Sequence, residues 1–273
     1  MAKLLHEQQE AELSRKVTWF LHDYGKYRLP LKEVLADFRA SDYNAYIFGG
    51  LLRDLMIGRL KSQPRDIDIV IGQTSADCVA TTFSRYLKRR TRFGGLHLNN
   101  EGWLFDVWPL EETWAFRSGL GLTADFSELP KTTFLNVEAV AIELSSRPGK
   151  TRCVYSSGFF EGIANREVDI NLEENPFPAL CVVRSLITAA RLQFSISSRL
   201  AKYIESAMQE IAIEELIEVQ RHHYGSVKCS SEQLRMWQKA IHEQRCISKS
   251  SLVRLPGTEI RQLSLWDDAN TTR

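Results

Sequence analysis

The sequence lacks several features that would each assign a chain to a class of protein. Its 35 basic and 34 acidic residues nearly cancel, leaving a formal net charge of +1. No global field therefore attracts a nucleic acid, and any basic binding surface must be local. The chain has no run of about 18 apolar residues, and its N-terminus has no apolar stretch followed by a cleavage site. These absences favour a cytoplasmic protein that does not bind membranes.

Cysteine is also scarce. The five cysteines are odd in number and widely spread, and they form no C-x-x-C pair or other zinc-binding spacing. They are Cys78, Cys153, Cys181, Cys229 and Cys246. We expect all five to be reduced thiols, with no disulfide framework and no structural zinc.

The first part of the chain carries helical periodicity and then changes period. Apolar residues at helical spacing predict one helix over 6–24 and another after Pro30. The short apolar run 45–48 predicts a strand, which Gly49-Gly50 ends, and the amphipathic segment 51–57 predicts a helix. This part of the chain is therefore expected to form a strand, a tight turn and a helix.

A second strand is predicted where Ile67, Ile69 and Ile71 alternate with Asp66, Asp68 and Val70. The two aspartates then share the face opposite the isoleucines. Segment 75–90 is typical of a helix. Segments 93–98 and 103–108 predict two strands joined by the turn 99–102, which forms a hairpin that ends near Asp106.

The alternation that predicts strands stops after residue 171. Helical patterns follow over 178–194, 200–216 and 232–241, and the segment after about 247 is polar. We therefore predict an α+β fold, in which a small mixed β-sheet flanked by helices is followed by a helical region. The predicted parts are N-terminal helices over 1–40, a sheet-based head over 41–172, a helical neck over 173–246 and a flexible tail over 247–273.

The carboxylates in this pattern suit a metal site. Two aspartates at i and i+2 on one strand project from the same face, about 7 Å apart along the chain. From there Asp66 and Asp68 can approach a pair of Mg²⁺ ions, with Asp106 as a third hard oxygen ligand from the hairpin. The alternative is a solvated strand end, and Asp106 could also begin a turn or pair with an arginine.

The Asp-x-Asp motif alone is weak evidence, because one match is expected roughly once in a chain of this length and composition. The neighbouring sequence makes the motif more specific. Gly49-Gly50 lies upstream of the pair, between a predicted strand and a predicted helix. Bare backbone amides at such a turn can hold a triphosphate. The combination indicates phosphoryl-transfer chemistry, which needs charge neutralisation and in-line positioning.

Two segments carry a resemblance to a known family. Gly49–Gly58, with the sequence GGLLRDLMIG, and Arg65–Val70, with the sequence RDIDIV, resemble the head signature of bacterial poly(A) polymerases and CCA-adding tRNA nucleotidyltransferases. These enzymes belong to the polymerase β-like superfamily. The resemblance implies metal binding by Asp66, Asp68 and Asp106, phosphate binding by Gly49 and Gly50, and organisation of the site by Arg53 and Asp54. It also implies two Mg²⁺ ions, a nucleoside triphosphate such as ATP or CTP, and addition to an RNA 3′ end.

A weaker likeness extends into the predicted neck at 174–176 and 184–194, so the resemblance covers about residues 44–200. The chain departs from the family at Thr132–Leu135, where the family carries Arg-Arg-Asp-Phe. It departs again at Cys181 and Ile187, where the family has base-reading arginines. These departures leave open nucleotidyl transfer to a protein or small molecule, and a binding module that has lost catalysis.

Two further groups of residues have open interpretations. The basic run Arg85, Lys88, Arg89, Arg90 and Arg92 could follow an RNA backbone or could end a helix. His222-His223 lacks the i, i+4 spacing of helical metal ligands, and we interpret it as a helix end before Gly225.

Overall fold

The structure is a computed structural model that describes residues 2–22, 25, 28–41, 43–60, 63–91, 94–145, 151–247 and 252–257. The chain divides into two compact units, Met1–Ala164 and Asn165–Arg273. Among the described helices, none combines the length and the apolar character needed to cross a bilayer. All five cysteines are free, as expected.

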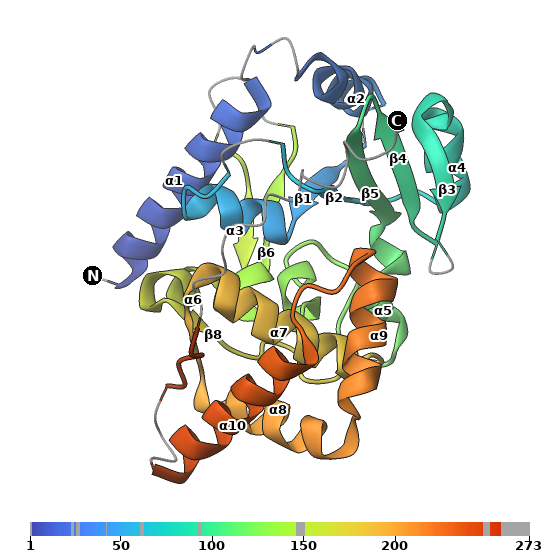
Figure 1. Ribbon diagram of the computed structural model, residues 1–273. Helices are drawn as coiled ribbons and strands as arrows, with labels where there is room; N and C mark the ends of the chain where they lie inside the picture. Colours follow the sequence, from blue (N-terminus) through green and yellow to red (C-terminus); the bar gives the residue numbers. More distant parts are fainter. Residues whose placement is uncertain are drawn as a thin grey trace. The chain divides into compact units, whose positions relative to one another are not determined.

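Unit 1 is built on a mixed sheet of seven strands in the order β3-β4-β5-β2-β1-β6-β7 (Figure 1). The strands are β1 (Ala45–Phe48), β2 (Ile67–Ile71), β3 (Leu87–Arg90), β4 (Leu96–Asn100), β5 (Trp103–Pro109), β6 (Val140–Glu143) and β7 (Val154–Ser156). β2 and β5 are parallel, and every other neighbouring pair is antiparallel. The sheet confirms the predicted α+β class.

The helices of unit 1 are mostly short. They are α1 (Ala2–His22), α2 (Leu29–Ala40), α3 (Gly50–Met56), α4 (Ala76–Thr82), α5 (Trp114–Arg117) and α6 (Phe159–Asn165, whose last residue falls in unit 2). Turns of 3₁₀ helix occur at η2 (Ser84–Tyr86), η3 (Leu110–Glu112), η4 (Leu129–Thr132) and η5 (Asn136–Glu138). The two predicted N-terminal helices are confirmed as α1 and α2.

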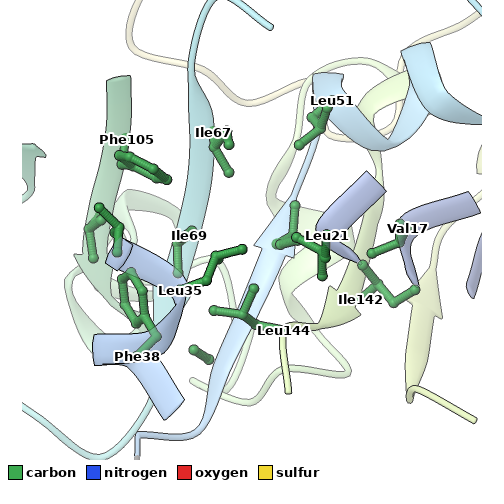
Figure 2. Close-up of a cluster of buried hydrophobic side chains, with 14 of the residues drawn as sticks. Val17, Leu21, Leu35, Phe38, Leu51, Ile67, Ile69, Phe105, Ile142 and Leu144 are labelled. Atoms are coloured by element: carbon green, nitrogen blue, oxygen red, sulfur yellow. The ribbon is translucent and has the colours of Figure 1, made fainter. Parts of the chain in front are cut away.

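The main hydrophobic core lies against one face of the sheet, called here the first face. Ile67, Ile69 and Ile71 of β2 are buried with apolar side chains of α1, α2 and α3. Figure 2 shows part of this cluster, in which side chains of these helices meet side chains of β2, β5 and β6. The alternation of β2 places Asp68 on the opposite face, as predicted.

The second face of the sheet is only partly apolar. Tyr46 and Phe48 of β1 and Val70 of β2 pack there against Phe126 and Leu129, which come from the segment between α5 and β6. The ring centroids of Tyr46 and Phe126 lie 4.2 Å apart in a stacked arrangement. Trp108 of β5 packs against the same cluster, while the row that begins at Asp68 carries polar side chains across the sheet toward β3.

One predicted element of unit 1 is wrong. A single helix was expected over 75–90, but α4 ends at Thr82, and β3 begins at Leu87 after the turn η2. Ser75 caps α4, since its Oγ accepts a hydrogen bond from the Cys78 amide. Lysine and arginine are good helix formers, but here the pairing of β3 with β4 overrides that local preference.

Unit 2 is mainly helical. It contains α7 (Pro178–Leu192), α8 (Ser198–Glu210), α9 (Ile213–Tyr224) and α10 (Ser231–Ile247), with the short parallel pair β8 (Glu167–Val168) and β9 (Ser195–Ile196). The helix expected over 200–216 is interrupted, because Ile211 and Ala212 are extended between α8 and α9. The unit begins at Asn165, a few residues before the predicted boundary at 172, because β8 pairs with β9.

The flexible tail predicted over 247–273 is corrected in part. Val253 is fully buried and exchanges two backbone hydrogen bonds with Ile196, at 2.8 and 2.9 Å. Segment 252–257 is therefore packed, because it extends the edge of the small sheet. Residues 258–273 lie outside the described residues.

Candidate active site

Polar side chains form a row across the second face of the sheet in unit 1. Asp68 of β2 pairs directly with Asp106 of β5, and Asp106 pairs on its other side with His97 of β4. Phe48 flanks Asp68 at one end of the row, and Arg89 of β3 pairs with His97 at the other. Directly paired residues have Cα atoms about 5 Å apart and point to the same face. The sheet therefore brings Asp68 and Asp106 together, as the sequence predicted.

Asp106 is half-buried and is contacted by His97. Nδ1 of His97 and Oδ1 of Asp106 form a hydrogen bond. Because an ionised carboxylate only accepts, Nδ1 carries the proton and donates it. Burial raises the pKa of Asp106, His97 lowers it, and the negative charge of Asp66 raises it again, so that the net direction is upward.

Asp66 lies just before β2, two residues from Asp68. Its Oδ2 forms an ion pair of 2.7 Å with Nη2 of the neighbouring Arg65, whose side chain is exposed. Asp66 is near enough for its charge to act on Asp106. The three predicted carboxylates therefore lie at the same part of the sheet, since Asp66 acts on Asp106 through its charge and Asp68 is the direct cross-strand partner of Asp106.

The Gly49-Gly50 turn lies directly beside this group. Gly49 has φ +76° and ψ −133°, a backbone conformation that residues with a Cβ rarely adopt. A Cβ built on Gly49 would lie 3.7 Å from Oδ2 of Asp68. The turn is anchored on one side by the hydrogen bond from the Gly49 amide to the Val140 carbonyl, at 3.1 Å. Backbone therefore approaches the carboxylates closely at this point.

Arg53 and Asp54 lie in α3, the helix that begins at the glycine turn. Arg53 is almost fully buried, and its Nε donates to Oδ1 of Asp54 at 2.8 Å. Its Nη1 donates to Oε1 of Glu138 in η5, also at 2.8 Å. Burial by itself lowers the pKa of Arg53, but Asp54 and Glu138 outweigh it and raise the pKa overall. This network ties α3, which follows the glycines, to the segment that leads into β6.

The donor set fits a hard divalent cation by its chemistry. Carboxylate oxygens are the ligands that Mg²⁺ prefers. Burial is the main cause of the raised pKa of Asp106, and the negative charge of Asp66 adds to it. Across the described part of the chain, no three ligating side chains already converge at metal-binding geometry. In this arrangement one oxygen of Asp106 contacts His97 and one oxygen of Asp66 contacts Arg65. Asp66, Asp68 and Asp106 stay the predicted metal ligands.

His97 and Glu138, which contact the predicted site residues Asp106 and Arg53, were missed from the sequence. His97 could have been found from the hairpin, since a two-residue turn at Glu101-Gly102 places His97 opposite Asp106. Both turn residues have positive φ, 46° and 87°, as such a turn requires. Glu138 could not have been found, because it lies 85 residues from Arg53 in the chain and no local pattern marks the pair.

The basic run does not end a helix. Lys88, Arg89 and Arg90 lie exposed on β3, the terminal strand of the sheet. Arg90 forms an ion pair with Asp77, and Arg85 on η2 forms an ion pair with Asp37 at 2.6 Å. Arg92 lies outside the described residues.

The interpretation of His222-His223 as a helix end is confirmed. α9 ends at Tyr224, and Gly225 follows with φ +70° in the left-handed conformation typical of a helix C-terminus.

Comparison with known proteins identifies the fold. No family model and no curated protein sequence matches the chain. Among solved structures, a CCA-adding enzyme in complex with CTP matches 86% of this chain at a TM-score of 0.57 and 17% identity. A CCA-adding enzyme with ATP matches 80% at 0.54 and 18% identity, and the Thermotoga maritima CCA-adding enzyme complexed with tRNA matches 86% at 0.53 and 16% identity.

These matches define a class of fold. The chain folds as the CCA-adding nucleotidyltransferases do, so the resemblance found in the sequence is confirmed at the level of the fold. It spans only part of their length, covering 55%, 52% and 61% of the three structures. At such low identity the likeness carries the fold and leaves activity, substrate and partners to be argued from the site.

Proposed function

We propose that the protein is a nucleotidyltransferase that transfers a nucleoside monophosphate from a nucleoside triphosphate to a hydroxyl group and releases pyrophosphate. The observation that carries the proposal is the direct pairing of Asp68 with Asp106, with the Gly49 backbone against Asp68. A fold shared with CCA-adding enzymes supports it. Carboxylates beside a glycine turn on one sheet face suit phosphoryl transfer, which depends on charge placement more than on covalent chemistry.

Asp66, Asp68 and Asp106 would hold two Mg²⁺ ions. When bound, such ions activate the attacking hydroxyl and neutralise charge on the triphosphate. Asp68 and Asp106 supply oxygens from adjacent strands, and Asp66 approaches from the start of β2. The sheet fixes the backbone positions from which the Asp68 and Asp106 side chains project.

The glycine turn would receive the triphosphate. A side chain at Gly49 would come between the backbone and Asp68, so the absence of a Cβ leaves room for phosphate oxygens beside the carboxylates. The buried Arg53, Asp54 and Glu138 network holds the turn in this conformation. We propose that Gly49 and Gly50 bind the nucleotide directly, while Arg53 and Asp54 position them.

An RNA 3′ end is the proposed acceptor, with ATP or CTP as the donor. The similar CCA-adding enzymes form complexes with CTP, ATP and tRNA. The exposed basic residues of β3 lie on the same sheet as the carboxylates and can contact an RNA backbone without reading its sequence.

Purified protein should be incubated with each labelled nucleoside triphosphate, Mg²⁺ and total RNA. We expect label in RNA, with pyrophosphate released in equal amount, and no incorporation by the Asp68→Asn variant. Glu218→Gln, a change at an exposed surface residue of unit 2, serves as the matched carboxylate control and should keep full activity.

The destination of the label separates the candidate functions. Label in protein or in a small molecule would retain nucleotidyl transfer but replace the acceptor. No incorporation anywhere, together with nucleotide binding by a folded protein, would contradict catalysis and favour a binding module.

A further inference from the structure

A histidine that no sequence motif indicated lies at the edge of the carboxylate group. His97 on β4 and Asp106 on β5 are direct cross-strand partners, and Asp106 in turn is the direct partner of Asp68. We propose that His97 is a positioning residue that holds the Asp106 carboxylate in the orientation needed to bind a divalent cation. This inference rests on the proposed function of the same site.

His97 donates from Nδ1 to Oδ1 of Asp106, and both side chains are half-buried. A hydrogen bond to an ionised carboxylate is about twice as strong as one between neutral groups. Partial burial strengthens it further, because less water competes for the same atoms.

The Asp106 carboxylate needs a partner that orients it. The terminal torsion of an aspartate side chain has a broad energy minimum, so the backbone alone does not fix where its oxygens point. Within the described part of the chain, His97 is the one side chain that forms a hydrogen bond with Asp106. Occupying Oδ1 in this way leaves Oδ2 as the oxygen available to a cation.

Asp66 and Asp106 differ in how their contacting side chains are held. Asp66 is held by the neighbouring Arg65, whose exposed side chain gives a weak and adaptable contact. His97 is instead held by the sheet, because its strand pairs with β5 over five consecutive residues. Groups that hydrogen bond to metal-binding carboxylates commonly change metal affinity by about 10–100-fold when they are removed.

The test measures binding of Mn²⁺ to the full chain, without nucleotide or RNA, from the electron paramagnetic resonance signal of the free ion. His97→Leu removes the donor at similar volume, and we expect about 10–100-fold weaker binding. His97→Asn places an amide N–H near the position of Nδ1 and should recover most of the affinity. His222→Leu, which removes an exposed histidine of unit 2, should leave it unchanged.

A structural role alone would not produce this pattern. If His97→Leu does not fold, His97→Val carries the same test, since a β-branched residue suits a strand and has no donor. The Mg²⁺ concentration that gives half-maximal transfer should follow the Mn²⁺ dissociation constant across the variants. It should be highest for His97→Leu and close to the wild-type value for His97→Asn. Rescue by asparagine in both measurements distinguishes positioning from packing.

Two outcomes overturn the inference in different ways. Wild-type Mn²⁺ affinity in folded His97→Leu, together with weak binding by Asp106→Ala, would remove the role of His97 and keep the proposed metal site. Wild-type affinity in both Asp68→Ala and Asp106→Ala would remove the metal site itself, and with it this inference.

Discussion

The two faces of the sheet in unit 1 use the same strands for different purposes. On the first face, Ile67, Ile69 and Ile71 of β2 are buried under helices, and their contribution is stability. On the second face, the intervening residue Asp68 stands beside Asp106 and the Gly49 turn. The alternation of a strand therefore separates the residues that hold the fold from those proposed to do the chemistry, within a distance of one residue.

The largest expected effect is on the second face. Asp68→Asn keeps the shape of the side chain and removes its charge, so we expect transfer activity to fall by about 10³-fold or more. The free energy of unfolding should change little, because Asp68 lies outside both apolar clusters and asparagine keeps its volume. Single-turnover rates and urea denaturation measure the two quantities. Retention of a tenth of the activity would falsify the assignment.

The matching change on the first face is Ile69→Ala, one residue away. It leaves a cavity in the main core, and we expect the free energy of unfolding to fall by about 2–5 kcal/mol. Activity per folded molecule should be nearly unchanged at low temperature. Urea denaturation followed by circular dichroism, with activity corrected for the folded fraction, makes the measurement. A selective loss of activity in fully folded protein would show that the two faces are not separable.

A smaller effect is expected where the second face meets the turn. Gly49→Ala places a Cβ on backbone at φ +76° and ψ −133°, which should cost about 1–3 kcal/mol of stability. Because the new Cβ would lie 3.7 Å from Oδ2 of Asp68, nucleotide affinity should fall as well. Calorimetric titration with a non-hydrolysable triphosphate tests this. Gly119→Ala is the control, since it has a similar φ of +74° and open space around it.

The smallest effect is expected at the edge of the sheet. Replacing Lys88 and Arg89 with alanine should weaken RNA binding by a few-fold and reduce its salt dependence by about one unit for each phosphate that the protein no longer neutralises. Nucleotide binding should not change. Arg85→Ala, which removes a cation already paired with Asp37, is the comparison. A salt dependence identical in both variants would argue against β3 as an RNA-binding strand.

Much of this arrangement could be predicted from local pattern. The alternation at β2, the hairpin of β4 and β5 and the glycine turn after β1 each follow from spacing within a few residues. They place Asp68 and Asp106 on predicted strands, but the parallel pairing of β2 with β5 that brings the two together joins distant segments and comes from the structure. The fold class followed from the same signals.

The remaining features depend on contacts between distant segments. The helix expected over 75–90 was wrong because Lys88 to Arg90 have helical preference, whereas pairing with β4 decides their conformation. Glu138 reaches Arg53 across 85 residues, and the burial of an arginine cannot be inferred without its partner. His97 lies between these cases, since its partner is fixed by hairpin register but its hydrogen bond is not.

The position of β3 has a consequence for how the protein behaves in concentrated solution. A terminal strand offers its backbone to strands of other molecules and can seed aggregation. Lys88, Arg89 and Arg90 are exposed along β3, and the pairing register shifts between Leu87 and Arg89. Like charges on two such strands repel, and an irregular strand is a poor template. The opposite edge of the sheet is β7, which is only three residues long. Both ends of the sheet are therefore unsuited to the addition of a further strand.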